Sequence, residues 1–162
     1  MQARKFARSA YTPRSFARAM LEMMRHIPDT HAAVHGGRVS KTFAEKIMLA
    51  VTQVNNCRYC NYHHTRQALK AGVSEEEIKR LAKVELGDFP EEEAVALMFA
   101  QHYAESGGQP EPAAWARLVD YYGEQTARDI LAYIRMIMMG NLLGNTFEAI
   151  VYRLTGRLAP AD

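Results

Sequence analysis

The chain has 162 residues, of which 48% are hydrophobic and 23% are charged, and its formal net charge is +2. A chain of this length is expected to form one domain and to bury roughly 68–70% of its unfolded surface, so it needs no disulfide scaffold to fold. No apolar run approaches the roughly 18 residues that a membrane span requires, which argues against a membrane partner.

The first 20 residues contain five basic residues and no acidic one, at Arg4, Lys5, Arg8, Arg14 and Arg18. Neither an apolar stretch nor a small-residue cleavage site follows, so a targeting segment is disfavoured. No basic face recurs elsewhere, which argues against a nucleic-acid partner. We therefore expect a solvated basic arm over residues 1–10 and a single helical domain over residues 11–162.

Helix-capping signals recur along the chain while the alternating pattern of strands is absent, which predicts an all-α fold. Thr12-Pro13 begins the first predicted helix, which runs to Pro28, and a short helix follows up to Gly36-Gly37. Ser40 is the predicted N-cap of a helix that ends at Asn55-Asn56. The next helix opens with the Cys57-Arg58-Tyr59-Cys60 sequence and continues through Leu69, before a stop at Gly72.

The second half of the chain continues in helices. Ser74-Glu75-Glu76-Glu77 is a capping box, and two further helices are predicted from Glu91 to about Glu105 and from Pro112 to Gly123. From Thr126 to about Leu154 the apolar helical pattern continues, and residues 134–138 are hydrophobic apart from Arg135, which predicts burial at the centre or between subunits. Gly140 and Gly144 would allow a neighbouring helix to approach closely, and Asn141 and Asn145 are expected to have satisfied amides.

Cys57 and Cys60 are the only cysteines, so they cannot belong to a larger disulfide framework. On one helical wheel these two residues and His64 fall within an arc of about 60°. A position near the helix N-terminus favours a thiolate at Cys57, while Cys60 lies one turn before the His64 imidazole. The pattern predicts a dithiol redox site in a cytoplasmic protein.

Glu45 lies on the preceding predicted helix, at a distance along the chain that allows it to reach His64 after the reversal at Asn55-Asn56. A carboxylate beside the imidazole would orient the ring and raise its basicity. We expect Glu45 to act as orienter or proton acceptor, His64 as base or relay, Cys60 as nucleophile and Cys57 as resolving cysteine. The helix-end position of Cys57 argues for the opposite order of the two thiols.

Three further aromatic side chains lie in this segment. Tyr59 and Tyr62 project from other parts of the wheel, so packing is the first explanation for both. His63 is expected to be exposed.

Glu45, eleven intervening residues, Cys57-x-x-Cys60, three residues and His64 together resemble the signature of the AhpD-like (alkyl hydroperoxidase D-like) proteins of the carboxymuconolactone decarboxylase superfamily. The similarity extends roughly over residues 40–150, including Ala68-Leu69-Lys70-Ala71-Gly72-Val73-Ser74. Tyr59 departs from the alkyl hydroperoxidase D pattern, which has a second histidine at that place, and this weakens the expectation of efficient peroxidase activity.

The resemblance implies an AhpD-like helical bundle that assembles as a trimer or hexamer. It also implies a dithiol that reduces hydroperoxides or disulfides, without a bound cofactor, and that an external dithiol reductant recycles; a lipoamide-linked system is one option. Decarboxylation of a muconolactone is disfavoured, because that branch of the superfamily does not use a cysteine pair.

Other functions remain open from the sequence. The same dithiol would serve a disulfide reductase or a redox sensor. Cys57, Cys60 and His64 would also supply three zinc ligands, with Glu45 or water as the fourth. Finally, both cysteines would be inert if they are simply packed in the core of an oligomeric helical module.

Overall fold

The computed structural model describes residues 8–155. Within this range the chain forms eight α-helices and one short 3-10 helix, without a strand, so the predicted all-α fold is confirmed. The helices are α1 (Pro13–Arg25), α2 (Ile27–Gly36), α3 (Lys41–Asn55), α4 (Arg58–Lys70), α5 (Glu75–Ala82), η1 (Leu86–Asp88), α6 (Glu91–Glu105), α7 (Pro112–Tyr122) and α8 (Glu124–Thr155).

The helices begin where the capping residues predict. Thr12, Ser40 and Ser74 each accept a hydrogen bond from a backbone N–H in the first turn of α1, α3 and α5, respectively. The first predicted helix is divided, because α1 ends at Arg25 and α2 starts two residues later. Pro28 lies in the first turn of α2, where its missing N–H costs no helical hydrogen bond.

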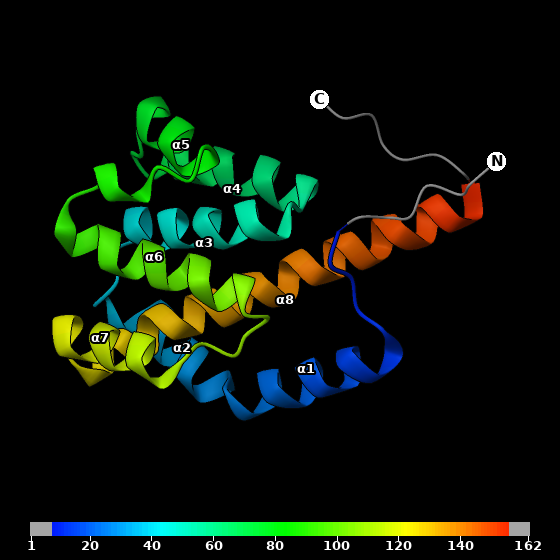
Figure 1. The fold of residues 1–162 in the computed structure, drawn as a ribbon, viewed down its shortest axis with the longest axis horizontal. Coiled ribbons are helices and arrows are strands. Elements are labelled where there is room, and N and C mark those ends of the chain that lie inside the picture. The colour runs from blue at the N-terminus through cyan, green and yellow to red at the C-terminus, as the bar shows by residue number, and fades with distance from the viewer. Residues whose placement is uncertain (1–7, 156–162) are drawn as a thin grey trace.

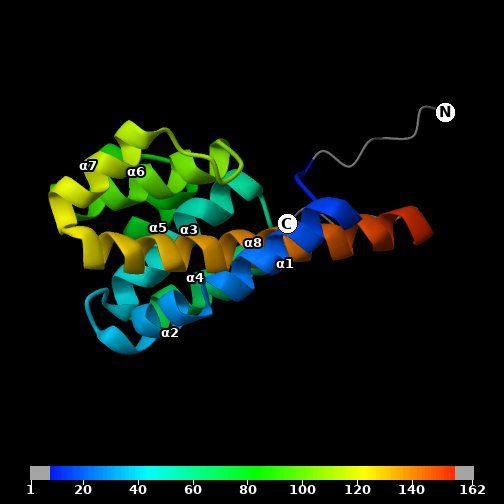
Figure 2. The ribbon, with the colours of Figure 1, turned by 90° about the horizontal axis from the view of Figure 1, so that it is seen from below.

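The core is built around α3, which packs against α4, α5, α6 and α8. Every residue from Ala44 to Thr52 is buried, because neighbours cover α3 on all sides. Helix α8 runs the length of the molecule, and its C-terminal turns extend beyond the other helices (Figures 1 and 2). Ile134 and Ile137 are buried in its middle, which confirms the predicted central position of this stretch.

A buried cation joins three of the core helices. The Lys46 ammonium group donates to Glu77 Oε1 of α5 over 2.6 Å and to Glu93 Oε2 of α6 over 2.7 Å. The hydrogen bond from Lys46 is the main reason that the pKa of Glu77 falls to about 2. This cluster fixes α3, which carries Glu45, relative to its neighbours.

Part of the predicted N-terminal arm lies against α8. Residues 1–7 lie outside the described residues, but Arg8 forms an ion pair with Glu148 and the Ser9 carbonyl accepts from Asn145. The far end of α8 carries exposed apolar side chains, at Leu143, Phe147, Ile150, Val151 and Leu154. Over residues 8–155, none of the helices combines the length and the apolar character needed to cross a membrane.

Candidate redox site

The two cysteines lie at the start of α4, where the chain reverses after α3. Asn56 caps α3 in the left-handed conformation, with φ of 51°, which asparagine tolerates better than most residues. Cys57 is the N-cap of α4 and has an extended backbone, so the helical wheel applies only to Cys60 and His64. The Cys57 Sγ accepts a hydrogen bond from the Cys60 backbone N–H over 3.3 Å. An N–H donor at the helix N-terminus stabilises negative charge on this sulfur.

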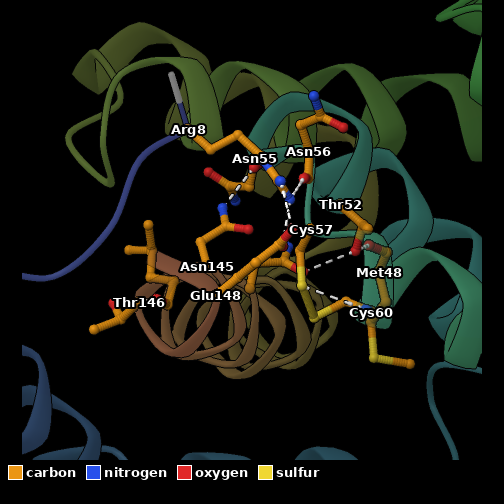
Figure 3. The surroundings of a disulfide bond; sticks show 12 residues. Arg8, Met48, Thr52, Asn55, Asn56, Cys57, Cys60, Asn145, Thr146 and Glu148 are labelled. Carbon is orange, nitrogen blue, oxygen red and sulfur yellow. Dashed lines mark hydrogen bonds and ion pairs between the residues drawn. A yellow bond between two sulfur atoms is a disulfide. The ribbon is translucent and has the colours of Figure 1, made fainter. Parts of the chain in front are cut away.

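Cys57 and Cys60 form a disulfide, with their Cα atoms 5.3 Å apart (Figure 3). Both residues are buried, with 2% of Cys57 and 6% of Cys60 exposed. On one side the sulfurs contact α8 at Gly144, where an added Cβ atom would lie 2.8 Å from Cys57 Sγ. Gly144 was predicted to allow a close approach by a helix; what approaches it is the disulfide.

Glu45 and His64 are in direct contact. His64 Nδ1 lies 2.8 Å from Glu45 Oε2, between α3 and α4, and both side chains are largely shielded from solvent. A carboxylate can only accept here, so Nδ1 carries the hydrogen and Nε2 is left as the basic ring nitrogen. His64 follows Cys60 by one helical turn. The arrangement therefore has an oriented imidazole on the same helix as the dithiol, as the sequence predicted.

A network of side-chain hydrogen bonds holds the backbone before Cys57. Asn145 Nδ2 of α8 donates to the carbonyl oxygens of Asn55, over 2.8 Å, and of Ser9, over 3.0 Å. The Arg8 guanidinium donates to the Asn56 carbonyl and also donates two hydrogen bonds, of 2.6 and 2.7 Å, to the Glu148 carboxylate (Figure 3). The N-terminal segment and α8 together fix the turn that positions the sulfurs. Nothing in the local sequence around the cysteines indicates these contacts, because their partners are 48 to 140 residues away.

The buried asparagines only partly meet the expectation of satisfied amides. Asn141 Oδ1 accepts a hydrogen bond from the Thr52 hydroxyl over 3.1 Å, and Asn145 Nδ2 donates to the Asn55 carbonyl. Among residues 8–155, no hydrogen-bond partner reaches Asn141 Nδ2 or Asn145 Oδ1.

The tyrosines of α4 do not pack in the core, so that expectation was wrong. Tyr59 is 72% exposed and Tyr62 is 62% exposed. Tyr59 stacks on the exposed His63 ring, which in turn meets His64 edge-on with 5.1 Å between ring centroids. Tyr59 and His63 therefore lie on the solvent side of α4, next to the largely shielded His64. The exposed position of His63 is as predicted.

A buried phenol that the sequence did not single out lies in the field of Glu45. Burial is the main cause that raises the pKa of Tyr133 on α8, and the charges of Asp129 and Glu45 raise it further. Tyr133 is therefore a neutral group at physiological pH, and its hydroxyl contacts the Ala33 carbonyl.

The structure contains no preformed zinc site in its described part. Over residues 8–155, no group of three histidine, cysteine, aspartate or glutamate side chains is placed to hold a metal ion. Cys57 and Cys60 are bonded to each other rather than open as two thiolate ligands. The arrangement has the elements of a redox pair, namely two adjacent sulfurs, a helix N-terminus and an oriented imidazole.

Residues 20–102, which include all four predicted site residues, match the carboxymuconolactone decarboxylase family. The chain belongs to this family. AhpD-like proteins are part of the same superfamily, so the resemblance seen in the sequence is confirmed at that level. Helix α8, which supplies Gly144 and Asn145, lies beyond the matched residues.

One curated protein is similar to this chain over most of its length. The uncharacterized protein YdfG of Bacillus subtilis (strain 168) is 29% identical over 123 residues, which cover 74% of this chain and 83% of that protein. No solved structure matches the chain.

Proposed function

We propose that this member of the carboxymuconolactone decarboxylase family is a thiol-dependent oxidoreductase that reduces organic hydroperoxides through its Cys57–Cys60 pair. The contact between Glu45 and His64 is the observation that carries the proposal, because it leaves an oriented basic nitrogen on the helix that holds the dithiol. Family membership and the disulfide at the N-terminus of α4 support a redox role.

The first half of the cycle begins from the reduced pair. His64 takes the thiol proton of Cys60, and the thiolate attacks one peroxide oxygen. The O–O bond breaks, Cys60 becomes a sulfenic acid and the alkoxide leaves as an alcohol with the proton from His64. The Cys57 thiolate then attacks the Cys60 sulfur, which forms the disulfide and releases water. Two thiols and one hydroperoxide thus give one disulfide, one alcohol and one water.

The second half needs an external dithiol. One of its thiolates attacks Cys60 Sγ, and Cys57 leaves as a thiolate. The hydrogen bond that Cys57 Sγ accepts from the Cys60 N–H stabilises this leaving group, and a stabilised thiolate leaves faster. The second thiol of the reductant then attacks the mixed disulfide, which frees Cys60 and leaves the reductant as a cyclic disulfide. This geometry is the reason to place the nucleophile at Cys60 and the resolving cysteine at Cys57.

Hydroperoxide consumption with dihydrolipoamide as reductant tests the assignment. Cys60→Ser is expected to abolish turnover, whereas Cys57→Ser should stop after one equivalent, with a sulfenic acid at Cys60 that dimedone traps. A Cys60→Ser protein that still forms a dimedone adduct at Cys57 would reverse the two roles. Unchanged turnover in both variants would refute the dithiol mechanism.

The two adjacent histidines provide a matched pair for the role of the imidazole. His64→Ala removes the ring that contacts Glu45, whereas His63→Ala removes an exposed ring on the same helix. Thiolate absorbance measured against pH should show a raised Cys60 pKa in His64→Ala and in Glu45→Gln, and no change in His63→Ala. Equal behaviour of the two histidine variants would refute the relay.

A disulfide reductase or redox sensor that uses the same dithiol is the second candidate. Tyr59 favours it, because this residue is largely exposed and provides no second imidazole near the sulfurs. Stopped-flow oxidation of the reduced protein by cumene hydroperoxide separates the two functions. An oxidation rate no greater than that of a free thiol of similar pKa would refute the proposed peroxidase activity, and the thiol–disulfide oxidoreductase function would remain.

We further propose that the protein is a cytoplasmic homo-oligomer. A dithiol that must be reduced in each turnover suits a reducing compartment. The apolar side chains at the end of α8, with Phe147 and Leu154 among the most exposed, suit a contact with another copy. The resemblance favours a trimer or hexamer. Light scattering coupled to size exclusion would reject this if the protein eluted as a monomer at micromolar concentration.

A further inference from the structure

A cleft away from the sulfurs has no part in the proposed redox cycle. It is a cavity of about 570 Å³ between α1, the loop that follows α6, and α8. A second cavity of about 340 Å³ shares four lining residues with it, namely His26, Tyr103, Gly108 and Arg135. Neither cysteine lines either cavity. Both volumes lie in the range of small-molecule sites, about 300–1,000 Å³.

Arg135 of α8 lies where the two cavities meet. Its side chain is partly buried, and its Nε atom is shielded from solvent without a hydrogen-bond partner. Over residues 8–155, no carboxylate pairs with its guanidinium and no carbonyl accepts from it. By contrast, Arg38 and Lys46 each have a carboxylate partner. Arginine remains charged at any physiological pH, and withdrawing a charge from water without a counter-ion costs free energy. The cavity therefore favours an anion at this guanidinium.

The remaining walls determine what kind of anion fits. The large aliphatic side chains that line the larger cavity are Met23, Met138, Met139 and Leu142. Its other charged side chains, Arg18, Glu22 and Glu105, are exposed, and solvent screens charges in such positions. His26 is engaged with Asp29 over 2.8 Å. The interior thus combines one planar cation with flexible apolar side chains, which adapt to an aliphatic chain.

We propose that this cleft binds a medium-chain aliphatic carboxylate. Its carboxylate pairs with the Arg135 guanidinium, whose two parallel N–H groups match the two oxygens. Its chain lies along the methionines of α1 and α8. This is a ligand site separate from the dithiol, and it does not depend on the redox state of the cysteines.

Intrinsic fluorescence can detect the ligand. Trp115 is the only tryptophan in the sequence and lines the smaller cavity together with Arg135. Titration with sodium decanoate, below its micellar concentration, should give a saturable change in emission. Decan-1-ol, which has no charge, and acetate, which has no chain, should each bind at least about tenfold more weakly, since tenfold corresponds to only about 1.4 kcal/mol and a hydrogen bond to a charged group or the burial of an alkyl chain contributes at least that much.

Two arginine variants form a matched pair. Arg135→Gln should weaken decanoate binding at least about tenfold, while Arg117→Gln, which removes an exposed arginine of α7 outside both cavities, should leave it unchanged. A protein with both cysteines replaced by serine should also bind normally. If Arg135→Gln does not fold, Met139→Phe tests the site instead, because it narrows the cavity, keeps the arginine and leaves Trp115 as the only tryptophan; normal binding to this variant would overturn the proposal.

Other results would also overturn it. Equal affinity for decanoate and decan-1-ol would show that the guanidinium does not recognise charge. Equal loss in Arg135→Gln and Arg117→Gln would show that the effect is not local. If Arg135→Gln dissociates an assembly seen for the unmodified protein by light scattering, a carboxylate of a second copy is the counter-ion and no ligand is required.

Discussion

Substitution of Gly144 by alanine tests whether α8 holds the sulfurs in place. An alanine Cβ would lie 2.8 Å from Cys57 Sγ and 3.6 Å from Cys60 Sγ, and the first distance is too short for a carbon–sulfur contact. Overpacking of this kind costs about 1–3 kcal/mol. Replacement of a mid-helix glycine by alanine also stabilises a helix by up to about 1 kcal/mol, so the measured effect is the difference of the two.

Gly140→Ala is the matched control, because Gly140 lies one turn earlier on α8 and nothing lies within 4 Å of its added Cβ atom. Both variants gain the same helix propensity, but only Gly144→Ala meets the sulfurs. In urea unfolding of the oxidised proteins, Gly144→Ala should be less stable than Gly140→Ala by about 1–3 kcal/mol.

Reduction should relieve the contact, since two free thiols can rotate away while a disulfide cannot. The midpoint potential of Gly144→Ala should then be about 20 to 60 mV less negative than that of Gly140→Ala, at 30 mV for each 1.4 kcal/mol. Maleimide labelling in defined dithiothreitol buffers measures this potential. Equal stabilities and potentials for the two variants would refute the view that the disulfide rests on Gly144.

Three further predictions concern the rest of the framework. The pKa of Glu77 is depressed to about 2, chiefly by Lys46, so its stabilisation is complete above its unfolded pKa of about 4.3 and is lost as the pH falls toward 2. Between pH 5 and pH 2.5, the free energy of unfolding measured with urea should fall by about 2 kcal/mol more in the unmodified protein than in Glu77→Gln. Equal decreases in the two proteins would contradict this. Arg38→Gln should destabilise the protein by about 3 kcal/mol, because it leaves the Asp129 carboxylate, which is 4% exposed, buried without its partner. Asp129→Asn should destabilise it by less, because the Arg38 side chain is 38% exposed and water can solvate its charge. The reverse order in urea unfolding would be inconsistent with this ion pair. Asn145→Ala should cost about 1–3 kcal/mol and speed hydrogen exchange in the turn before the cysteines, since a buried carbonyl loses its donor, and unchanged exchange would count against the network.

Local patterns were enough to predict most helices and the core of the site. Thr12, Ser40 and Ser74 cap helices as expected, because capping depends on residues three positions apart. The meeting of Glu45 with His64 was also predictable, since only a short reversal separates their antiparallel helices. The same local reasoning did not predict the exposure of Tyr59, because a helical wheel gives the direction of a side chain but not whether another helix covers it.

The helical class, the family and the position of a cysteine pair at a helix N-terminus can be inferred from the amino-acid sequence alone, because these follow from neighbours along the chain. Three features of α8 emerge only from the packed helices: Gly144 lies against the sulfurs, Asn145 holds the turn before them, and Arg135 is a cation without a partner among residues 8–155. All three depend on how α8 lies on the bundle, and its contacts at the site join residues about 90 positions apart. Such packing follows from the complementarity of whole helix surfaces, which no local pattern contains.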